Sequence, residues 1–346
     1  MKFPAFVAAL LLTALSTPAL ADGLVDNANG YTLDAKGQLV RFTGLLIDKR
    51  GTITKVLDKN DKRPKMLDFM LDAKGRTLIP GLIDNGMHLM EAALADLPRD
   101  ETMRDRPIQP RERDAAFARI QLKFLERGVT SVTDLATSTT DWNVYRRSGD
   151  AGHLRIRIIG YAADIDTMMS VAGNRPTPWL YDGRLRLTGL TVTDQAPFND
   201  ARVRNLMSRG AMDGFQIAAE PIGEAALDHS LAAIEEVAET YNGDRRWRLH
   251  TRERPPQLHE RLAATGTLAI TRADDTFTNL ATFFAVRTRD AAHAAFAEGK
   301  LGTLTPGAYA DFLLFDRDLI ALPPAEAGQA RLLETWIGGV RAWTAK

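Results

Sequence analysis

The 346-residue chain contains no cysteine and carries no net charge. Without a thiol it can form no disulfide, no thiolate metal ligand and no thiol nucleophile. Because 44 Lys and Arg residues offset 44 Asp and Glu residues, no net field attracts nucleic acid or an anionic membrane. We therefore expect neither as a partner, and we interpret the basic cluster of Arg245, Arg246, Arg248 and Arg252 as a solvated loop or rim.

Several short catalytic motifs are also missing. The chain has no Gly-rich phosphate loop, no Gly-x-Ser-x-Gly nucleophile turn and no His-Glu-x-x-His helix. Phosphoryl transfer, serine hydrolysis and zincin chemistry therefore have no support in the sequence. Apolar residues make up 45% of the chain and charged residues 25%, which is ordinary for a globular protein.

An apolar run lies at the N-terminus, where residues 5–15 are interrupted only by Thr13. The run is too short to span a bilayer as a stable anchor. A lysine precedes it, and Ala19-Leu20-Ala21 follows it and fits the small-x-small rule for signal peptidase cleavage. We expect residues 1–21 to be a signal peptide, and the mature chain to be exported, most simply to a bacterial periplasm, without a membrane anchor.

The pattern of apolar and turn-forming residues changes twice along the rest of the chain. Residues 22–80 and 301–346 consist of short alternating or β-branched segments separated by turns, whereas strand and helix patterns alternate over residues 81–300. Such alternation predicts parallel βα units. The expected fold is α/β: a reduced TIM-like (β/α) barrel over residues 81–300, with a composite β-sandwich formed by the two terminal segments. About 220 residues are few for a complete eight-unit barrel of roughly 250.

Individual elements can be predicted within this plan. Helical spacing predicts helices over residues 115–127, which end at Gly128, and over residues 225–240. A C-terminal hairpin with Gly338-Gly339 as its turn is expected over residues 334–343. The expected strands are 38–42, 45–47, 52–57, 129–135, 155–159, 215–219, 247–250 and 310–316.

Four segments, taken in order, carry a family resemblance. Residues 75–90 read GRTLIPGLIDNGMHLM, residues 128–134 read GVTSVTD, residues 215–228 read FQIAAEPIGEAALD, and residues 301–316 read LGTLTPGAYADFLLFD. They resemble the first, second and fifth strand segments of the amidohydrolase superfamily and its return into the β-sandwich. The fifth-strand segment is similar to the YtcJ-like, amidohydrolase-3 branch. The closing segment, residues 336–343 (WIGGVRAW), resembles the last hairpin of the family.

The resemblance implies a metal site at the carboxyl ends of the barrel strands. Family members carry a His-x-His pair on the first strand, a Lys or Glu, histidines on the fifth and sixth strands, and an aspartate base on the eighth. The metal lowers the pKa of a bound water and polarises a carbonyl. Here the first-strand pair is Gly86 and His88, and the fifth-strand histidine falls on Glu220. The candidate metal ligands are therefore His88 and Glu220.

The remaining positions fit the family pattern less well. The sixth-strand position falls on Thr251, and a one-residue slip predicts that His250 points away from the site. The lysine position falls near Arg186, which stays protonated and cannot form a carbamate. Asp274 and Asp275 are the candidate catalytic bases.

Each candidate has a structural alternative. His88 can be a vestigial strand-end residue, Glu220 can cap the following helix, and Asp274-Asp275 can be a helix N-cap or a turn. The four other histidines are expected to be solvated: His153, His229, His259 and His293.

Two functional hypotheses follow from the resemblance. The first is a non-catalytic or small-molecule-binding descendant with a degraded metal site and no cofactor. The second is an active but atypical hydrolase of amide or other C–N bonds that uses zinc or another divalent metal.

Overall fold

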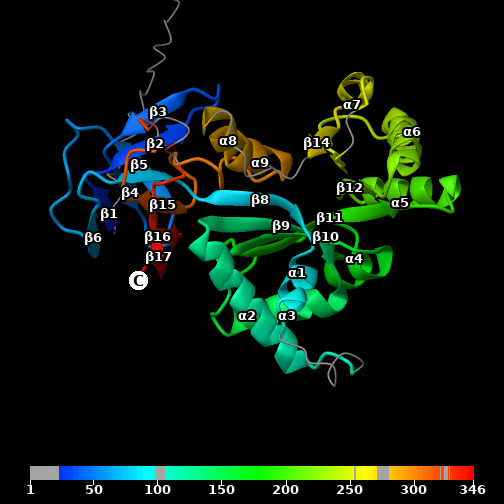
Figure 1. The fold of residues 1–346 in the computed structure, drawn as a ribbon, viewed down its shortest axis with the longest axis horizontal. Coiled ribbons are helices and arrows are strands. Elements are labelled where there is room, and N and C mark those ends of the chain that lie inside the picture. The colour runs from blue at the N-terminus through cyan, green and yellow to red at the C-terminus, as the bar shows by residue number, and fades with distance from the viewer. Residues whose placement is uncertain are drawn as a thin grey trace, which may run out of the picture.

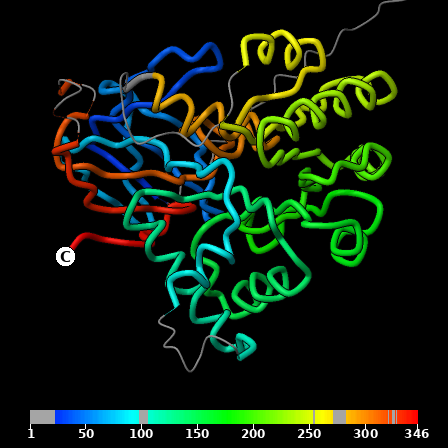
Figure 2. Tube along the Cα trace, turned by 45° about the vertical axis from the view of Figure 1, so that its right-hand side comes forward, coloured from blue at the N-terminus to red at the C-terminus, as the bar shows by residue number. Residues whose placement is uncertain are grey.

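The computed structural model describes residues 23–346 except 98–105, 253–254, 271–279, 320, 323–325 and 327. The predicted signal peptide and the predicted bases Asp274 and Asp275 lie outside these residues. The strands form three sheets (Figure 1). Figure 2 shows the same division from another side, with the first and last parts of the chain together and the middle of the chain beside them.

A four-stranded sheet comes from the N-terminal segment alone. Its strands lie in the order β5-β4-β1-β6, with β1 antiparallel to β4 and parallel to β6. The strand bounds are β1 Gly23–Asp26, β4 Gly44–Ile47, β5 Ile53–Leu57 and β6 Phe69–Asp72.

A six-stranded sheet combines both ends of the chain in the order β17-β16-β15-β7-β2-β3. The C-terminal β15 pairs antiparallel with the N-terminal β7, so that Phe312 lies opposite Pro80. The composite sheet predicted from the sequence is thus confirmed. The bounds are β2 Asn29–Leu33, β3 Leu39–Phe42, β7 Thr77–Pro80, β15 Phe312–Phe315, β16 Leu332–Ile337 and β17 Val340–Thr344.

The two sheets share a core because β15 alternates its apolar side chains. Phe312 and Leu314 enter a buried cluster with residues of the four-stranded sheet such as Val25 and Leu45. Leu313, between them, joins a second cluster that contains Phe284 of α8 (Leu280–Arg287). Period-two alternation therefore lets one strand bury both faces, one in the sandwich and one against the next part of the chain.

The third sheet is the predicted barrel. Its seven described strands are parallel in the order β14-β13-β12-β11-β10-β9-β8. Within the described residues no strand ladder joins β14 back to β8, so the barrel is nearly closed. The bounds are β8 Leu82–Met87, β9 Val129–Thr137, β10 Arg157–Ala162, β11 Leu185–Asp194, β12 Gln216–Pro221, β13 Arg248–His250 and β14 Leu268–Ile270.

Helices follow the barrel strands, and most of them cover the strands on the outside. In α2 a proline at the first position and a reciprocal cap between Gln109 and Glu112 fix the start, and Gly128 follows the end at φ 74°. The other bounds are α1 Leu89–Ala95, α2 Pro110–Glu126, α3 Thr139–Asp150, α4 Ile165–Ala172, α5 Asp200–Met212, α6 Glu224–Thr240, α7 Leu258–Thr265 and α9 Arg289–Ala294.

Alternation along the barrel strands separates an inner cluster from an outer one. On β12, Ala218 belongs to the inner cluster, whereas Ile217 and Ala219 belong to the large outer cluster under the helices. Ala291 and Ala292 of α9 pack into the inner cluster. Side chains therefore fill this part of the barrel interior, as is usual for barrels whose ligand sites lie at the carboxyl ends of the strands. No described helix is long and apolar enough to cross a membrane.

Candidate functional site

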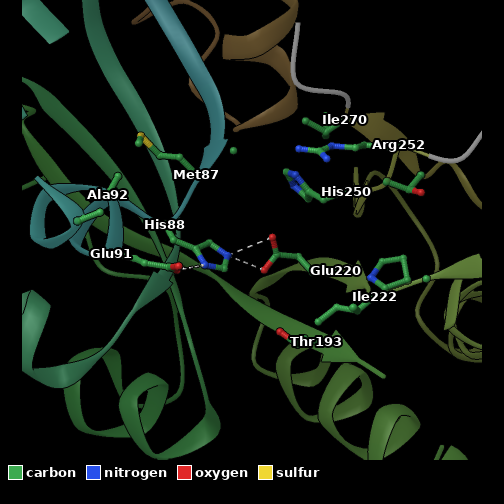
Figure 3. Close-up of a pocket in the computed structure, with 15 residues that line it drawn as sticks. Met87, His88, Glu91, Ala92, Thr193, Glu220, Ile222, His250, Arg252 and Ile270 are labelled. Carbon is green, nitrogen blue, oxygen red and sulfur yellow. Dashed lines mark hydrogen bonds and ion pairs between the residues drawn. The ribbon is translucent and has the colours of Figure 1, made fainter. Parts of the chain in front are cut away.

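A cavity of about 630 Å³ opens where β8, β11, β12, β13 and β14 end (Figure 3). Parallel strands bring their carboxyl ends to the same edge of a sheet, which is where barrel proteins bind ligands. Both predicted metal ligands, His88 and Glu220, line this cavity. The other lining residues are Gly86, Met87, Glu91, Ala92, Ala95, Thr193, Pro221, Ile222, Gly223, His250, Thr251, Arg252 and Ile270.

His88 lies between two carboxylates. Its Nε2 is 3.0 Å from Oε2 and 3.2 Å from Oε1 of Glu220, and its Nδ1 is 3.0 Å from Oε2 of Glu91. His88 follows β8 directly, and Glu91 stands one turn later in α1. A carboxylate only accepts hydrogen bonds, so these contacts favour a ring in which both nitrogens donate. That form is an imidazolium, which has no lone pair for a metal ion.

The charge of His88 follows from the same contacts. The hydrogen bond to Glu220 is the largest cause that raises the pKa of His88 from 6.5 to about 9, and Glu91 adds to it. Burial acts in the opposite direction but is weaker, since 39% of the side chain stays exposed. Glu220 does not cap the following helix, because α6 begins after Gly223 and has no side-chain cap.

His250 occupies the space beside Gly86. A Cβ atom built on Gly86 would lie 2.7 Å from Cε1 and 2.8 Å from Nδ1 of His250, closer than real Cβ contacts allow. His250 lines the cavity (Figure 3), as does Thr251. The prediction that His250 points away from the site is therefore wrong. Leu249 faces the outer core, and this fixes its neighbours Arg248 and His250 on the inner side of the strand.

The predicted lysine position is also corrected by the structure. Arg186 lies near the start of β11, stacks on Trp179 and donates to the carbonyls of Ala295 and Phe296. Strand register instead places Thr193 opposite Glu220 at the end of β11. The fourth-strand side chain that lines the cavity is thus Thr193, which brings a hydroxyl and no charge.

Arg248 shows how the interior below the cavity is organised. It is fully buried, contrary to its interpretation as part of a solvated cluster. Its guanidinium donates to the Tyr161 hydroxyl at 3.1 Å and to Oδ1 of Asn85 at 2.6 Å. These bonds tie β13 to β10 and to β8, one residue before Gly86. Sequence reasoning missed this role because an arginine beside other arginines is typical of a surface.

His229, expected to be solvated, is partly buried and paired with two carboxylates. From α6 it bridges Asp194 at the end of β11 and Asp200 at the start of α5, with both N···O distances 2.5 Å. Asp194, followed by Asp200, raises the pKa of His229, and burial opposes this. The bridge lies next to the cavity. The carbonyl of Asp194 accepts a hydrogen bond from the amide of Ile222, which lines the cavity.

The described donors do not fit a divalent metal ion. Both nitrogens of His88 face carboxylates, Gly86 offers no ligand, and Thr193 and Thr251 offer only hydroxyls. A catalytic zinc site needs about three protein ligands around one point. Among the residues that the structure describes, no group of three or more His, Asp or Glu side chains could hold an ion.

Comparison with known proteins agrees with the fold. Residues 271–342 match the family model described as Amidohydrolase family. No curated protein sequence matches the chain. Among solved structures, an uncharacterized metal-dependent hydrolase from Pyrococcus horikoshii OT3 is 13% identical and has a TM-score of 0.69, with 88% of this chain and 99% of that chain covered.

A second solved structure is also similar over most of its length. Atrazine chlorohydrolase TrzN from Arthrobacter aurescens TC1, complexed with zinc, is 16% identical and has a TM-score of 0.65. The match covers 92% of this chain and 94% of that chain. At these identities the likeness establishes the fold alone. The chain thus has the fold of these metal-dependent hydrolases, and its C-terminal segment, residues 271–342, is similar to the amidohydrolase family.

Proposed function

We propose that this protein binds a small polar molecule in the barrel-end cavity without a divalent metal, and that it is a non-catalytic descendant of metal-dependent amidohydrolases. The observation that carries the proposal is the position of His88, whose two ring nitrogens both face carboxylates. An imidazolium there takes the place of the positive charge that a metal would supply. Hydrolysis then lacks its activated water.

The cavity itself supports a binding role. Its volume of about 630 Å³ lies within the usual range of small-molecule sites. Apolar side chains such as Met87, Ile222 and Ile270 line it beside a few charged ones. This mixture is typical of pockets in which polar groups orient a ligand and apolar surface provides affinity.

A metal analysis tests the proposal. The protein is purified without a histidine tag, dialysed against zinc, and its bound metal is measured by plasma mass spectrometry. We expect far less than one zinc per chain, no rise in Tm with zinc, and amide and ester hydrolysis at background. His88→Ala should leave the zinc content unchanged. Near-stoichiometric zinc that is lost in His88→Ala would contradict the proposal.

An active, atypical hydrolase of C–N bonds is the second candidate. One observation favours it: the family match begins at residue 271 and therefore includes Asp274 and Asp275, the candidate bases. In this alternative His88 and Glu220 would hold one metal ion with one of these aspartates. Hydrolysis that needs added zinc and is lost in both Asp274→Asn and Asp275→Asn would favour it.

We further propose that the chain is exported after cleavage behind Ala21. The support is the apolar run and the Ala19-Leu20-Ala21 site in the sequence. Mass spectrometry of protein exported from a bacterial host should give Asp22 as the first residue. Exported protein that retains Met1 would contradict cleavage.

A further inference from the structure

The cavity carries charges of both signs on opposite sides. On one side, Glu91 contacts His88, whose other ring nitrogen contacts Glu220 of β12. Arg252 lies near His250 after the end of β13, the strand next to β12, and on the side of the cavity away from Glu91 (Figure 3). A ligand that reaches from Glu91 to Arg252 would meet both signs.

Arg252 has no hydrogen bond or ion pair with another residue in the part of the chain that the structure describes. It lines the cavity, and it is exposed. Arg246, nearby in sequence, is by contrast bonded to Asp244 and Glu298. A guanidinium at the edge of a pocket suits a carboxylate, which it can bind through two parallel hydrogen bonds.

Two carboxylates, those of Glu91 and Glu220, contact the single ring of His88. One ring can neutralise at most one of them, so a negative charge remains beside His88. Glu91 is the accessible one, because 77% of its side chain is exposed and it contacts His88 through Oε2 only. Its other oxygen can accept a hydrogen bond from an ammonium group.

Apolar side chains line the cavity as well. Met87 and Ala92 lie on the acidic side, and Ile222 and Ile270 line the cavity near β12 and β14. The lining thus offers a carboxylate, Glu91, on one side and a guanidinium, Arg252, on the other. A ligand with one charged end of each sign therefore matches the pocket better than a simple anion or cation does.

We infer that the cavity binds a zwitterion whose ammonium and carboxylate stand at the two ends of a short apolar chain. The carboxylate binds Arg252 and the ammonium binds Glu91. This inference rests on the proposed function, because it takes the cavity as a metal-free binding site. It adds the chemical class of the ligand and names the residue that binds each of its ends.

A matched ligand series tests the inference on the mature protein. Isothermal titration calorimetry at low salt, in the presence of EDTA, compares 6-aminohexanoate with hexanoate and hexylamine, which lack one charge each. Shorter and longer ω-amino acids measure the span. The best zwitterion should bind at least about tenfold more tightly than either singly charged analogue of its length, the ratio that corresponds to 1.4 kcal/mol.

Two variants assign the ends of the ligand. Arg252→Gln should weaken binding of the zwitterion and of hexanoate but not of hexylamine, and Glu91→Gln should weaken the zwitterion and hexylamine only. Arg119→Gln and Glu126→Gln, exposed residues of α2, are matched controls and should change nothing. Circular dichroism confirms that each variant is folded.

The inference is overturned if no zwitterion binds, if the singly charged analogues bind as tightly, or if Arg252→Gln leaves zwitterion binding intact. Failure of the proposed function looks different. In that case zinc binds stoichiometrically through His88, whatever the charge preference of the EDTA-treated protein.

Discussion

Two ion pairs, one at each end of the barrel, have opposite surroundings. At the start of β10, Arg157 binds Asp311 through two parallel bonds of 2.6 and 2.8 Å, and the side chains are only 1% and 8% exposed. At the far end, His88 binds Glu220 with side chains that are 39% and 19% exposed. The first pair is enclosed by protein, whereas the second faces a cavity.

The difference separates a structural contact from a binding one. Asp311 directly precedes β15, and its Oδ1 also accepts from the Gly338 amide in the last hairpin. The Arg157 pair therefore joins the barrel to the composite sheet. The His88 pair joins two barrel strands and leaves part of each side chain open to a ligand. Removing one partner of the buried pair should lower the free energy of unfolding. Removing one partner of the exposed pair should mainly alter the cavity.

The largest effect is expected from Asp311→Ala. This change leaves Arg157 buried without its carboxylate, and loss of one partner of a buried pair costs about 3–5 kcal/mol. Urea denaturation measures the free energy of unfolding. The matched control is Glu236→Ala, which removes one partner of the exposed Arg204–Glu236 pair and should cost less than about 1 kcal/mol. Equal losses in the two variants would show that burial does not distinguish these pairs.

Gly86→Ala should have an intermediate effect. The new methyl group overlaps the His250 ring, and overpacking of this kind costs about 1–3 kcal/mol. His250→Ala removes the obstacle, so the methyl group should cost much less in that background. A double-mutant cycle on Tm and unfolding free energy measures the coupling. The same cost in both backgrounds would mean that His250 does not occupy the space beside Gly86.

The smallest effect concerns pH and His88. Its folded-state pKa of about 9 exceeds the ordinary 6.5. Its contribution to the free energy of unfolding is therefore complete below pH 6.5 and is lost as pH rises through about 9. Because the ring is partly exposed, screening limits the contribution to about 1 kcal/mol. Over this range the stability of the wild type should fall relative to His88→Asn. The shift of His229 has the same sign, and the difference between the two proteins removes it. Parallel pH profiles would contradict the raised pKa.

The sequence predicts the architecture better than it predicts the site. The helix over residues 225–240 appears as α6, and the strand over residues 129–135 appears within β9, because long periodic patterns reflect burial directly. Pairing of the C-terminal segment with the N-terminal one was also predictable, since neither segment has enough strands to bury its own faces.

The orientation of short elements could not be predicted in the same way. β13 has only three residues, so its sequence contains no alternation that fixes the inward face. Packing of Leu249 under the helices decides it, and this turns Arg248 and His250 inward. The pairing of His88 with Glu91 was within reach, because the two are three residues apart at a helix start. The contact at the second ring nitrogen comes from Glu220, which is 132 residues away in sequence and could not be predicted from local spacing.

The central claim is that both ring nitrogens of His88 carry hydrogens that carboxylates accept. Two-dimensional ¹⁵N–¹H NMR of the histidine rings at neutral pH, with His88→Asn for assignment, measures this directly. The account predicts that both His88 nitrogens have the shifts of a protonated imidazolium, and that equimolar zinc leaves them unchanged. A neutral ring at pH 7, or one nitrogen that moves to a metal-bound shift when zinc is added, would contradict the account.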